Sequence, residues 1–136
     1  AFFGSLIATL THILGAEWCY IERLEGRELP PYDQCEFREE APPPFAAIDE
    51  GWKRQTARTT AAIQRVRDWS APVVYTVDRD DGRRFRVAAT AGDLFTQLAL
   101  HEVHHRAQAL NILRHLGAPA LGDLDFNTMM YSRQPV

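Results

Sequence analysis

The stretch that decides the fold is LFTQLALHEVHHRAQALNILRHLG, residues 94–117. Its apolar residues recur at helical spacing, so it predicts one long amphipathic helix. Thr90 is a suitable N-cap for this helix, and Asp93 three residues later completes a capping pattern. Gly117 and Pro119 end the pattern, because glycine readily follows a helix and proline cannot continue one.

Two histidines interrupt the apolar stripe of this helix. At 100° per residue, the apolar side chains within about 60° of Leu98 are Leu94, Phe95, Ala109, Ile112, Leu113 and Leu116. His101 and His105 fall on the same stripe and, being four residues apart, are stacked on one face. A buried polar group needs a partner, and a metal ion is the simplest partner for two adjacent imidazoles. The stripe therefore predicts a metal site at His101 and His105.

The composition indicates a single domain over residues 1–136, long enough to bury a core. The net charge of −3 and the scattered basic residues give no basis for nucleic-acid binding. No apolar run is long enough to span a membrane, and no signal peptide is visible. Cys19 and Cys35 form neither a metal spacing nor a disulfide framework, so we expect a cytoplasmic protein. The chain begins at Ala1 without methionine, so we expect further residues upstream.

A second long helix is predicted over residues 3–24, where apolar side chains recur at steps of three and four residues. It should end near Gly26. The face opposite its apolar stripe carries His12 among the small residues Ser5, Ala8, Ala16 and Cys19. These neighbours leave room for His12 to point into a cleft, although a histidine on a solvent-facing surface fits the same pattern.

Residues 26–44 form a long, proline-rich connection without periodicity, and its length would let the next helix run parallel to the first. That helix is predicted over Phe45–Trp69, and Pro72 ends it. Its outer side carries Arg54, Arg58 and Arg65, which we interpret as a solvated face rather than a basic patch.

The pattern then changes to alternation, which predicts a short β-hairpin around an Asp81-Gly82 turn. Because an isolated hairpin is marginally stable, it should pack on the helices. Residues 123–131 are expected to form one or two helical turns near the C-terminus.

The segment His101-Glu102-Val103-His104-His105 also satisfies the H-E-x-x-H motif of zinc peptidases. In such a site two histidines bind zinc and the glutamate activates a water molecule. The longer form of the motif requires glycine and histidine where this chain has Gln108 and Asn111. A zinc peptidase is therefore an alternative, and a non-catalytic protein with a structural metal or mutually bonded histidines is another.

A different resemblance covers most of the chain. FFGSLIATLTHILGAEWCYIERL resembles the second helix of the DinB/YfiT-like family, and HEVHHRAQALNILRHLG resembles its fourth helix. The order of helix, long crossover, helix, hairpin-like insert and helix also matches, as does the tail at residues 124–126. The resemblance implies an all-α fold, a four-helix bundle with an up-down-down-up course and a short β-hairpin before the last long helix.

The resemblance also implies a site and a function. Members of the family bind a divalent metal through one histidine of the second helix and two of the fourth, which correspond to His12, His101 and His105. Zinc is the first expectation, with nickel or iron as alternatives. Relatives include transferases and an isomerase that use low-molecular-weight thiols, so a metal-dependent enzyme acting on a small molecule is expected. Glu102 and His104 are the candidate catalytic residues, as a base or as outer partners of the ligands.

The first helix of the family has no counterpart in this sequence. Three helices and a hairpin would leave an apolar face open, including Phe2, Phe3 and Trp18. We therefore expect this face to be covered by an upstream helix or by a second copy, and we favour a homodimer.

Overall fold

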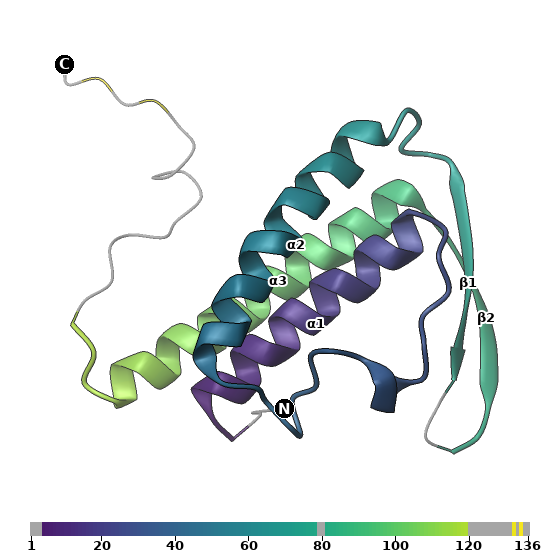
Figure 1. The fold of residues 1–136 in the computed structure, drawn as a ribbon. Coiled ribbons are helices and arrows are strands. Elements are labelled where there is room, and N and C mark those ends of the chain that lie inside the picture. The colour runs from purple at the N-terminus through teal and green to yellow at the C-terminus, as the bar shows by residue number, and fades with distance from the viewer. Residues whose placement is uncertain (1–3, 79–80, 120–131, 133, 135–136) are drawn as a thin grey trace.

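The computed structural model describes residues 4–78, 81–119, 132 and 134. Within them the chain forms three α-helices, one short 3-10 helix and a two-stranded antiparallel sheet (Figure 1). In chain order the elements are α1 (Leu6–Leu24), η1 (Tyr32–Gln34), α2 (Phe45–Arg65), β1 (Pro72–Asp78), β2 (Arg84–Thr90) and α3 (Ala91–His115). In the described part of the chain, no helix is both long enough and apolar enough to cross a bilayer.

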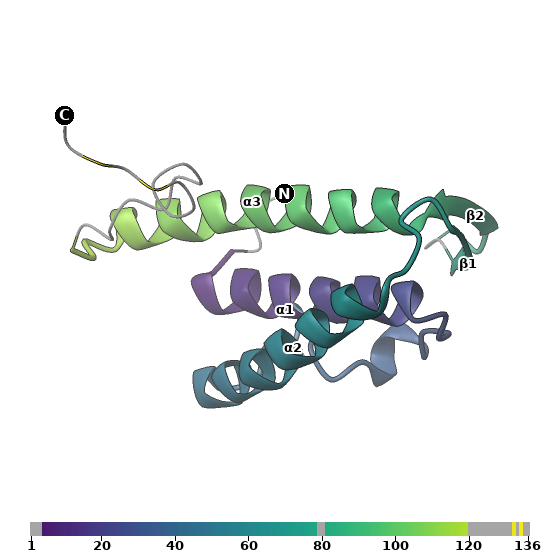
Figure 2. The same cartoon turned by 90° about the horizontal axis from the view of Figure 1, so that it is seen from above.

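Helix α1 lies between α2 and α3 and packs against both (Figure 2). α1 and α2 run in the same direction, and α3 returns antiparallel to them (Figures 1 and 2). The parallel course predicted from the long crossover is therefore confirmed. These directions match the last three helices of an up-down-down-up bundle. The described residues supply three long helices, so the fourth stays a prediction.

The core lies along both sides of α1. Ile21 of α1, Ala62 of α2 and Leu98 of α3 form one buried cluster. Leu14 of α1 and Ile48 of α2 are also fully buried. A helix in the middle of a layer needs apolar or small residues on two opposite sides, which is why α1 has both an apolar stripe and a small-residue face.

Small polar residues let α1 be buried on both sides without unsatisfied hydroxyl groups. Ser5 caps the helix, and its Oγ accepts a hydrogen bond from the backbone N–H of Ala8 at 3.2 Å. The buried Thr9 and Thr11 donate their hydroxyls to the backbone carbonyls of Ser5 and Ile7, at 2.9 and 2.8 Å.

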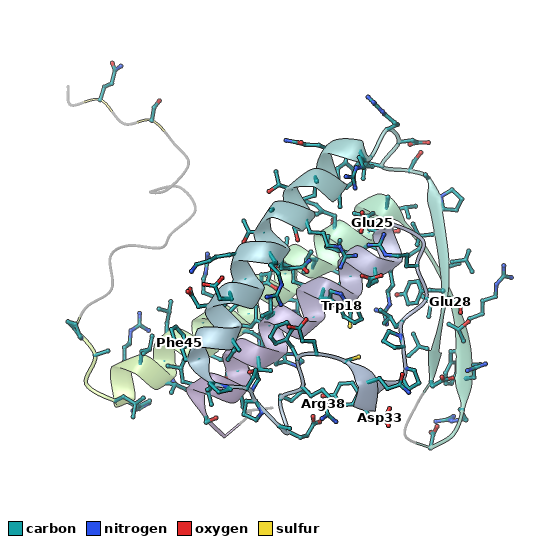
Figure 3. The ribbon with its side chains drawn as sticks, in the orientation of Figure 1. Trp18, Glu25, Glu28, Asp33, Arg38 and Phe45 are labelled. Carbon is teal, nitrogen blue, oxygen red and sulfur yellow. The ribbon has the colours of Figure 1, made fainter. Side chains whose placement is uncertain are left out.

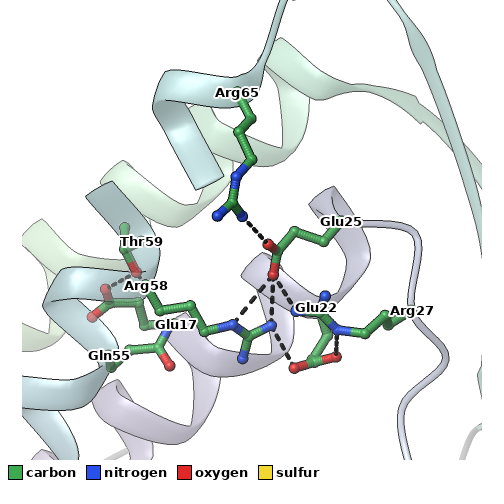
Figure 4. A network of polar contacts seen from close by, with 8 residues as sticks. All are labelled: Glu17, Glu22, Glu25, Arg27, Gln55, Arg58, Thr59 and Arg65. Carbon is green, nitrogen blue, oxygen red and sulfur yellow. Dashed lines mark hydrogen bonds and ion pairs between the residues drawn. The ribbon is translucent and has the colours of Figure 1, made fainter. Parts of the chain in front are cut away.

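A network of charged side chains joins α1 to α2 (Figure 4). Arg58 Nη2 lies 2.5 Å from Glu22 and 2.8 Å from Glu25, and Arg65 donates to Glu25 at 3.1 Å. Arg27 contacts both glutamates. The predicted solvated face is confirmed for Arg54 and Arg65, which are exposed, whereas Arg58 is half-buried and paired with Glu22 and Glu25.

Helix α2 ends at Arg65 and not at Trp69, which corrects the predicted boundary. Val66 is already extended, with ψ of 116°. Two residues on, the carboxylate of Asp68 accepts hydrogen bonds from the backbone N–H and the hydroxyl of Ser70. Such local bonding competes with the helical pattern and ends the helix before Pro72 is reached.

The predicted hairpin is confirmed. β1 and β2 pair antiparallel, with Pro72 opposite Thr90 at one end and Asp78 opposite Arg84 at the other. The half-buried side chains of β1 alternate along the strand, as a hairpin packed on helices requires; they are Val73, Tyr75 and Val77. Gly82 in the connection has φ of 78°, a conformation that favours glycine.

The helix that decides the fold begins as predicted. Thr90 Oγ1 accepts from the backbone N–H of Asp93 at 3.0 Å, and the Asp93 carboxylate accepts from the backbone N–H of Thr90 at 2.9 Å. This is a complete capping box. At the other end Gly117 has φ of 75° and donates to the carbonyl of Arg114.

The buried stripe of α3 is narrower than predicted. Its buried residues are Ala91, Leu94, Leu98, His105 and Ala109. Phe95 and Leu116, which were expected on the same stripe, are exposed. The predictions for Phe2, Phe3 and residues 123–131 lie outside the described residues.

Candidate metal centre

Three histidines meet where α1 packs against α3. His12 Nε2 lies 3.0 Å from His101 Nε2. The ring centroid of His105 lies 4.6 Å from that of His12 and 4.3 Å from that of His101. One ligand atom from each residue lies within 4.8 Å of the others, so the three could hold one metal ion. The structure therefore brings together all three histidines singled out in the sequence, and His12 points into the molecule. Metal binding itself stays a prediction.

Gln108 orients the ring of His105. The amide oxygen of Gln108 can only accept a hydrogen bond, and it lies 2.8 Å from His105 Nδ1, so the Nδ1–H donates. This tautomer places the lone pair of His105 on Nε2, which makes Nε2 the atom suited to bind an ion. The amide nitrogen of Gln108 contacts His104 Nε2 at 3.0 Å. Gln108 thus links His105 to His104, which is itself exposed.

The surroundings of His101 and His105 favour the neutral form that binds metals. Burial, followed by the neighbouring His105 and His12, lowers the pKa of His101 to about 4. Burial also lowers the pKa of His105, against the opposing effect of its hydrogen bond to Gln108. The Nδ1 atom of His101 is buried and has no hydrogen-bond partner among the described residues. Neutral imidazoles in a desolvated cluster fit a divalent ion.

The surroundings of Glu102 disfavour the charged form of its carboxyl group. Burial, followed by the negative charge of Glu17, raises the pKa of Glu102 to about 8. Its Oε1 atom is buried without a hydrogen-bond partner in the described part of the chain. Glu17 in turn accepts a hydrogen bond from Thr59 at 2.5 Å (Figure 4). The catalytic roles expected for Glu102 and His104 stay predictions.

A cavity of about 270 Å³ adjoins the histidines. Its lining includes His12 and His101 and, beyond them, Gly15, Ala16, Trp18, Cys19, Tyr20, Tyr32, Cys35, Phe37 and Glu39. Most of these residues come from α1 and from the crossover between α1 and α2. Figure 3 shows Trp18 on α1 and marks the crossover at Asp33 and Arg38. The cavity therefore has aromatic walls and two histidines at one edge, an arrangement suited to a small molecule.

The two cysteines lie in the wall of this cavity as free thiols. Burial raises the pKa of Cys19 to about 11, so the thiol stays protonated at neutral pH.

The comparisons with known proteins agree with this geometry. A model of the DinB superfamily matches residues 1–109, which include His12, His101 and His105. The chain belongs to the DinB superfamily. The resemblance seen in the two histidine-bearing helices is thereby confirmed, and the match extends through the crossover, α2 and the hairpin of this DinB protein. The comparisons with curated proteins and with solved structures gave no significant match.

Two residues of this DinB site were missed in the sequence. Gln108 is three residues after His105 on the same helix, so helical spacing was a usable signal. Glu39 lies in the non-periodic crossover, yet its Oε1 is 3.4 Å from His12 Nδ1. No spacing rule connects a residue of an irregular segment to a histidine on the preceding helix, so Glu39 had no sequence signal.

Proposed function

We propose that this DinB superfamily protein is a cytoplasmic, divalent-metal-dependent enzyme that acts on a small molecule. The observation that supports the proposal is the meeting of three histidines, two of which line an aromatic cavity. Three protein ligands leave positions open for a substrate, whereas structural metal sites are usually closed by four. The family membership and the donor set support the same function.

Zinc is our first choice of metal, and nickel or iron are the alternatives, because imidazole suits all three. When bound, the ion would supply Lewis-acid chemistry to a substrate oxygen or thiol. The reaction classes that fit are a transfer involving a low-molecular-weight thiol and a hydrolysis.

The chain's own residues position the reactants. Trp18, Tyr20 and Phe37 give the cavity aromatic walls that exclude water and hold an apolar part of the substrate. Gln108 keeps the lone pair of His105 on Nε2. His12 and His101 face the cavity, so a substrate held there meets the metal site directly.

Metal analysis of purified variants tests the proposal. We expect about one ion per chain in the wild type, and at least a tenfold loss of affinity in His12→Ala, His101→Ala and His105→Ala. His115→Gln is the matched control, because His115 is exposed near the end of the same helix. Equal metal content in all five proteins would refute the site.

A casein-cleavage assay on the loaded protein separates the proposed enzyme from a zinc peptidase. A loaded protein that turns over neither peptides nor thiol substrates would support a structural metal instead.

We also propose that the protein is a homodimer. Leu100 and Val103 lie three residues apart on α3 and are 62 % and 55 % exposed. An apolar face of this kind favours burial against a second copy around a two-fold axis. Light scattering tests this, and Val103→Glu should dissociate the dimer. A monomeric wild-type protein would refute it.

A further inference from the structure

Glu39 lies beside the histidine that α1 contributes to the site. Its Oε1 atom is 3.4 Å from His12 Nδ1, within ion-pair distance. On the other side of the same ring, His12 Nε2 faces His101 Nε2 at 3.0 Å. One ring nitrogen of His12 thus meets a carboxylate and the other meets the histidine cluster. Histidines that bind metals commonly donate their second ring N–H to a carboxylate in this way.

The carboxylate is held in place by its own contacts. The single hydroxyl hydrogen of Tyr32 is shared between Glu39 and Glu40, whose carboxylate oxygens lie 2.8 and 2.6 Å from the Tyr32 oxygen. Burial, followed by these two glutamates, raises the pKa of Tyr32, so its hydroxyl stays protonated and able to donate. Tyr32 of the 3-10 helix η1 therefore holds the carboxylate of Glu39 in place.

Phe37 packs the crossover that carries Glu39 against α1 and α2. A side chain at Gly15 would come within 2.9 Å of the Phe37 carbonyl oxygen, and one at Gly51 within 2.5 Å of Phe37 Cζ. Both glycines therefore make room for Phe37 between α1 and α2. Arg54 on α2 adds an ion pair to Glu36 at 2.7 Å. Because Phe37 is two residues before Glu39, this docking sets the position of the carboxylate.

We propose that Glu39 is a positioning residue of the metal site, which acts by holding a hydrogen on His12 Nδ1 and the lone pair on Nε2. The proposal rests on the proposed metal-binding function. It implies that the 3.0 Å contact runs from the Nε2–H of His101 to Nε2 of His12. The Nδ1 atom of His101 then carries a lone pair, which agrees with its lack of a hydrogen-bond partner in the described part of the chain.

The site thereby has an orienting partner on each of two ligands, from different parts of the chain. Gln108 orients His105 from the same helix, and Glu39 orients His12 from the crossover. A carboxylate also makes the imidazole more basic than an amide does, so it strengthens the bond to a cation. The crossover therefore contributes to metal affinity without supplying a ligand.

Glu40 provides the matched control. It is the next residue, carries the same charge, accepts a hydrogen bond from the same Tyr32 hydroxyl and also interacts electrostatically with His12. It therefore controls for negative charge near the ring, whereas the oxygen 3.4 Å from His12 Nδ1 belongs to Glu39. We expect Glu39→Ala to lower the affinity for Zn²⁺ or Co²⁺ about 10- to 100-fold, as is usual for such partners, and Glu40→Ala to lower it less than about threefold. Glu39→Gln should recover part of the loss, because its amide oxygen accepts from Nδ1–H as Gln108 does for His105.

A measurement on the metal-free protein separates this proposal from the metal-binding function itself. Long-range ¹⁵N–¹H NMR at one fixed pH reports which nitrogen of His12 carries the hydrogen. We expect the Nδ1–H tautomer in the wild type and in Glu40→Ala, and a shift toward Nε2–H in Glu39→Ala. The proposal is overturned if Glu39→Ala keeps the wild-type tautomer, or if the two alanine variants lose metal affinity equally. A wild type that binds no metal but shows the Glu39-dependent tautomer refutes the proposed function alone.

Discussion

The substitution Gly51→Ala tests how the crossover is held against the helices. An added Cβ would lie 2.5 Å from Phe37 Cζ and 2.8 Å from Leu14 Cδ2. Leu14 is 1 % exposed and Gly51 is buried, so Phe37 must move by roughly 1 Å to restore an ordinary contact. Overpacking of this kind costs about 1–3 kcal/mol, and alanine recovers about 1 kcal/mol in a helix. We therefore expect a net loss of about 0–2 kcal/mol in the free energy of unfolding.

The larger effect should fall on the metal site, because moving Phe37 moves Glu39 away from His12. We expect Gly51→Ala to weaken Co²⁺ binding about tenfold, measured by titration alongside urea unfolding. Ala57→Gly on the exposed side of α2 is the control, since it measures the glycine–alanine difference where no side chain is crowded. Unchanged Co²⁺ affinity in Gly51→Ala would refute the reasoning that Phe37 positions the carboxylate.

Four further outcomes are expected. Burial alone would raise the pKa of Glu25, but hydrogen bonds from Arg58 and Arg27 outweigh it and hold that pKa below its usual range. The stabilisation from Glu25 is therefore complete above about pH 4.5 and is lost progressively as the pH falls below that value. By urea unfolding, Glu25→Gln should cost about 1 kcal/mol at pH 7 and progressively less as the pH falls below about 4.5. Alkylation of Cys19 by iodoacetamide should rise about tenfold per pH unit from pH 7 to 10, and a plateau below pH 9 would contradict its raised pKa of about 11. Ala16→Leu narrows the cavity and should weaken binding of benzyl mercaptan to the cobalt-loaded protein about tenfold, while mercaptoethanol binding is unchanged. Glu102→Gln should lower turnover of the loaded enzyme while retaining metal, and unchanged turnover would remove this residue from the mechanism.

Helix positions and the histidine cluster could be predicted because helical periodicity encodes them directly. His101 and His105 share a face four residues apart, and His12 stands among small residues on another helix. Strong local signals also gave the start of α3, where Thr90 and Asp93 form the capping box.

The errors arose where local bonds or tertiary packing decide the structure. The turn at Asp68 ends α2 early, and its hydrogen bonds to Ser70 have no periodic signature. The pairing of Arg58 with Glu22 and Glu25 depends on which helix lies next to α2, which the sequence of α2 alone does not contain. The role of Glu39 was missed for the same reason, because its contact with His12 depends on how Phe37 packs the crossover against the helices.

The histidine site also lies at the contact between two of the three described helices. An ion held by His12 and His101 would link α1 to α3. It would also stabilise the folded chain, because it would bind the folded state more tightly than the unfolded state. The proton that His101 carries on Nε2 would then move to Nδ1, where the described residues provide no acceptor. Metal binding should therefore leave a buried His101 N–H that exchanges slowly with solvent, and NMR of the loaded protein should detect it. A loaded protein whose His101 keeps its hydrogen on Nε2 would show that His101 does not bind the ion through Nε2.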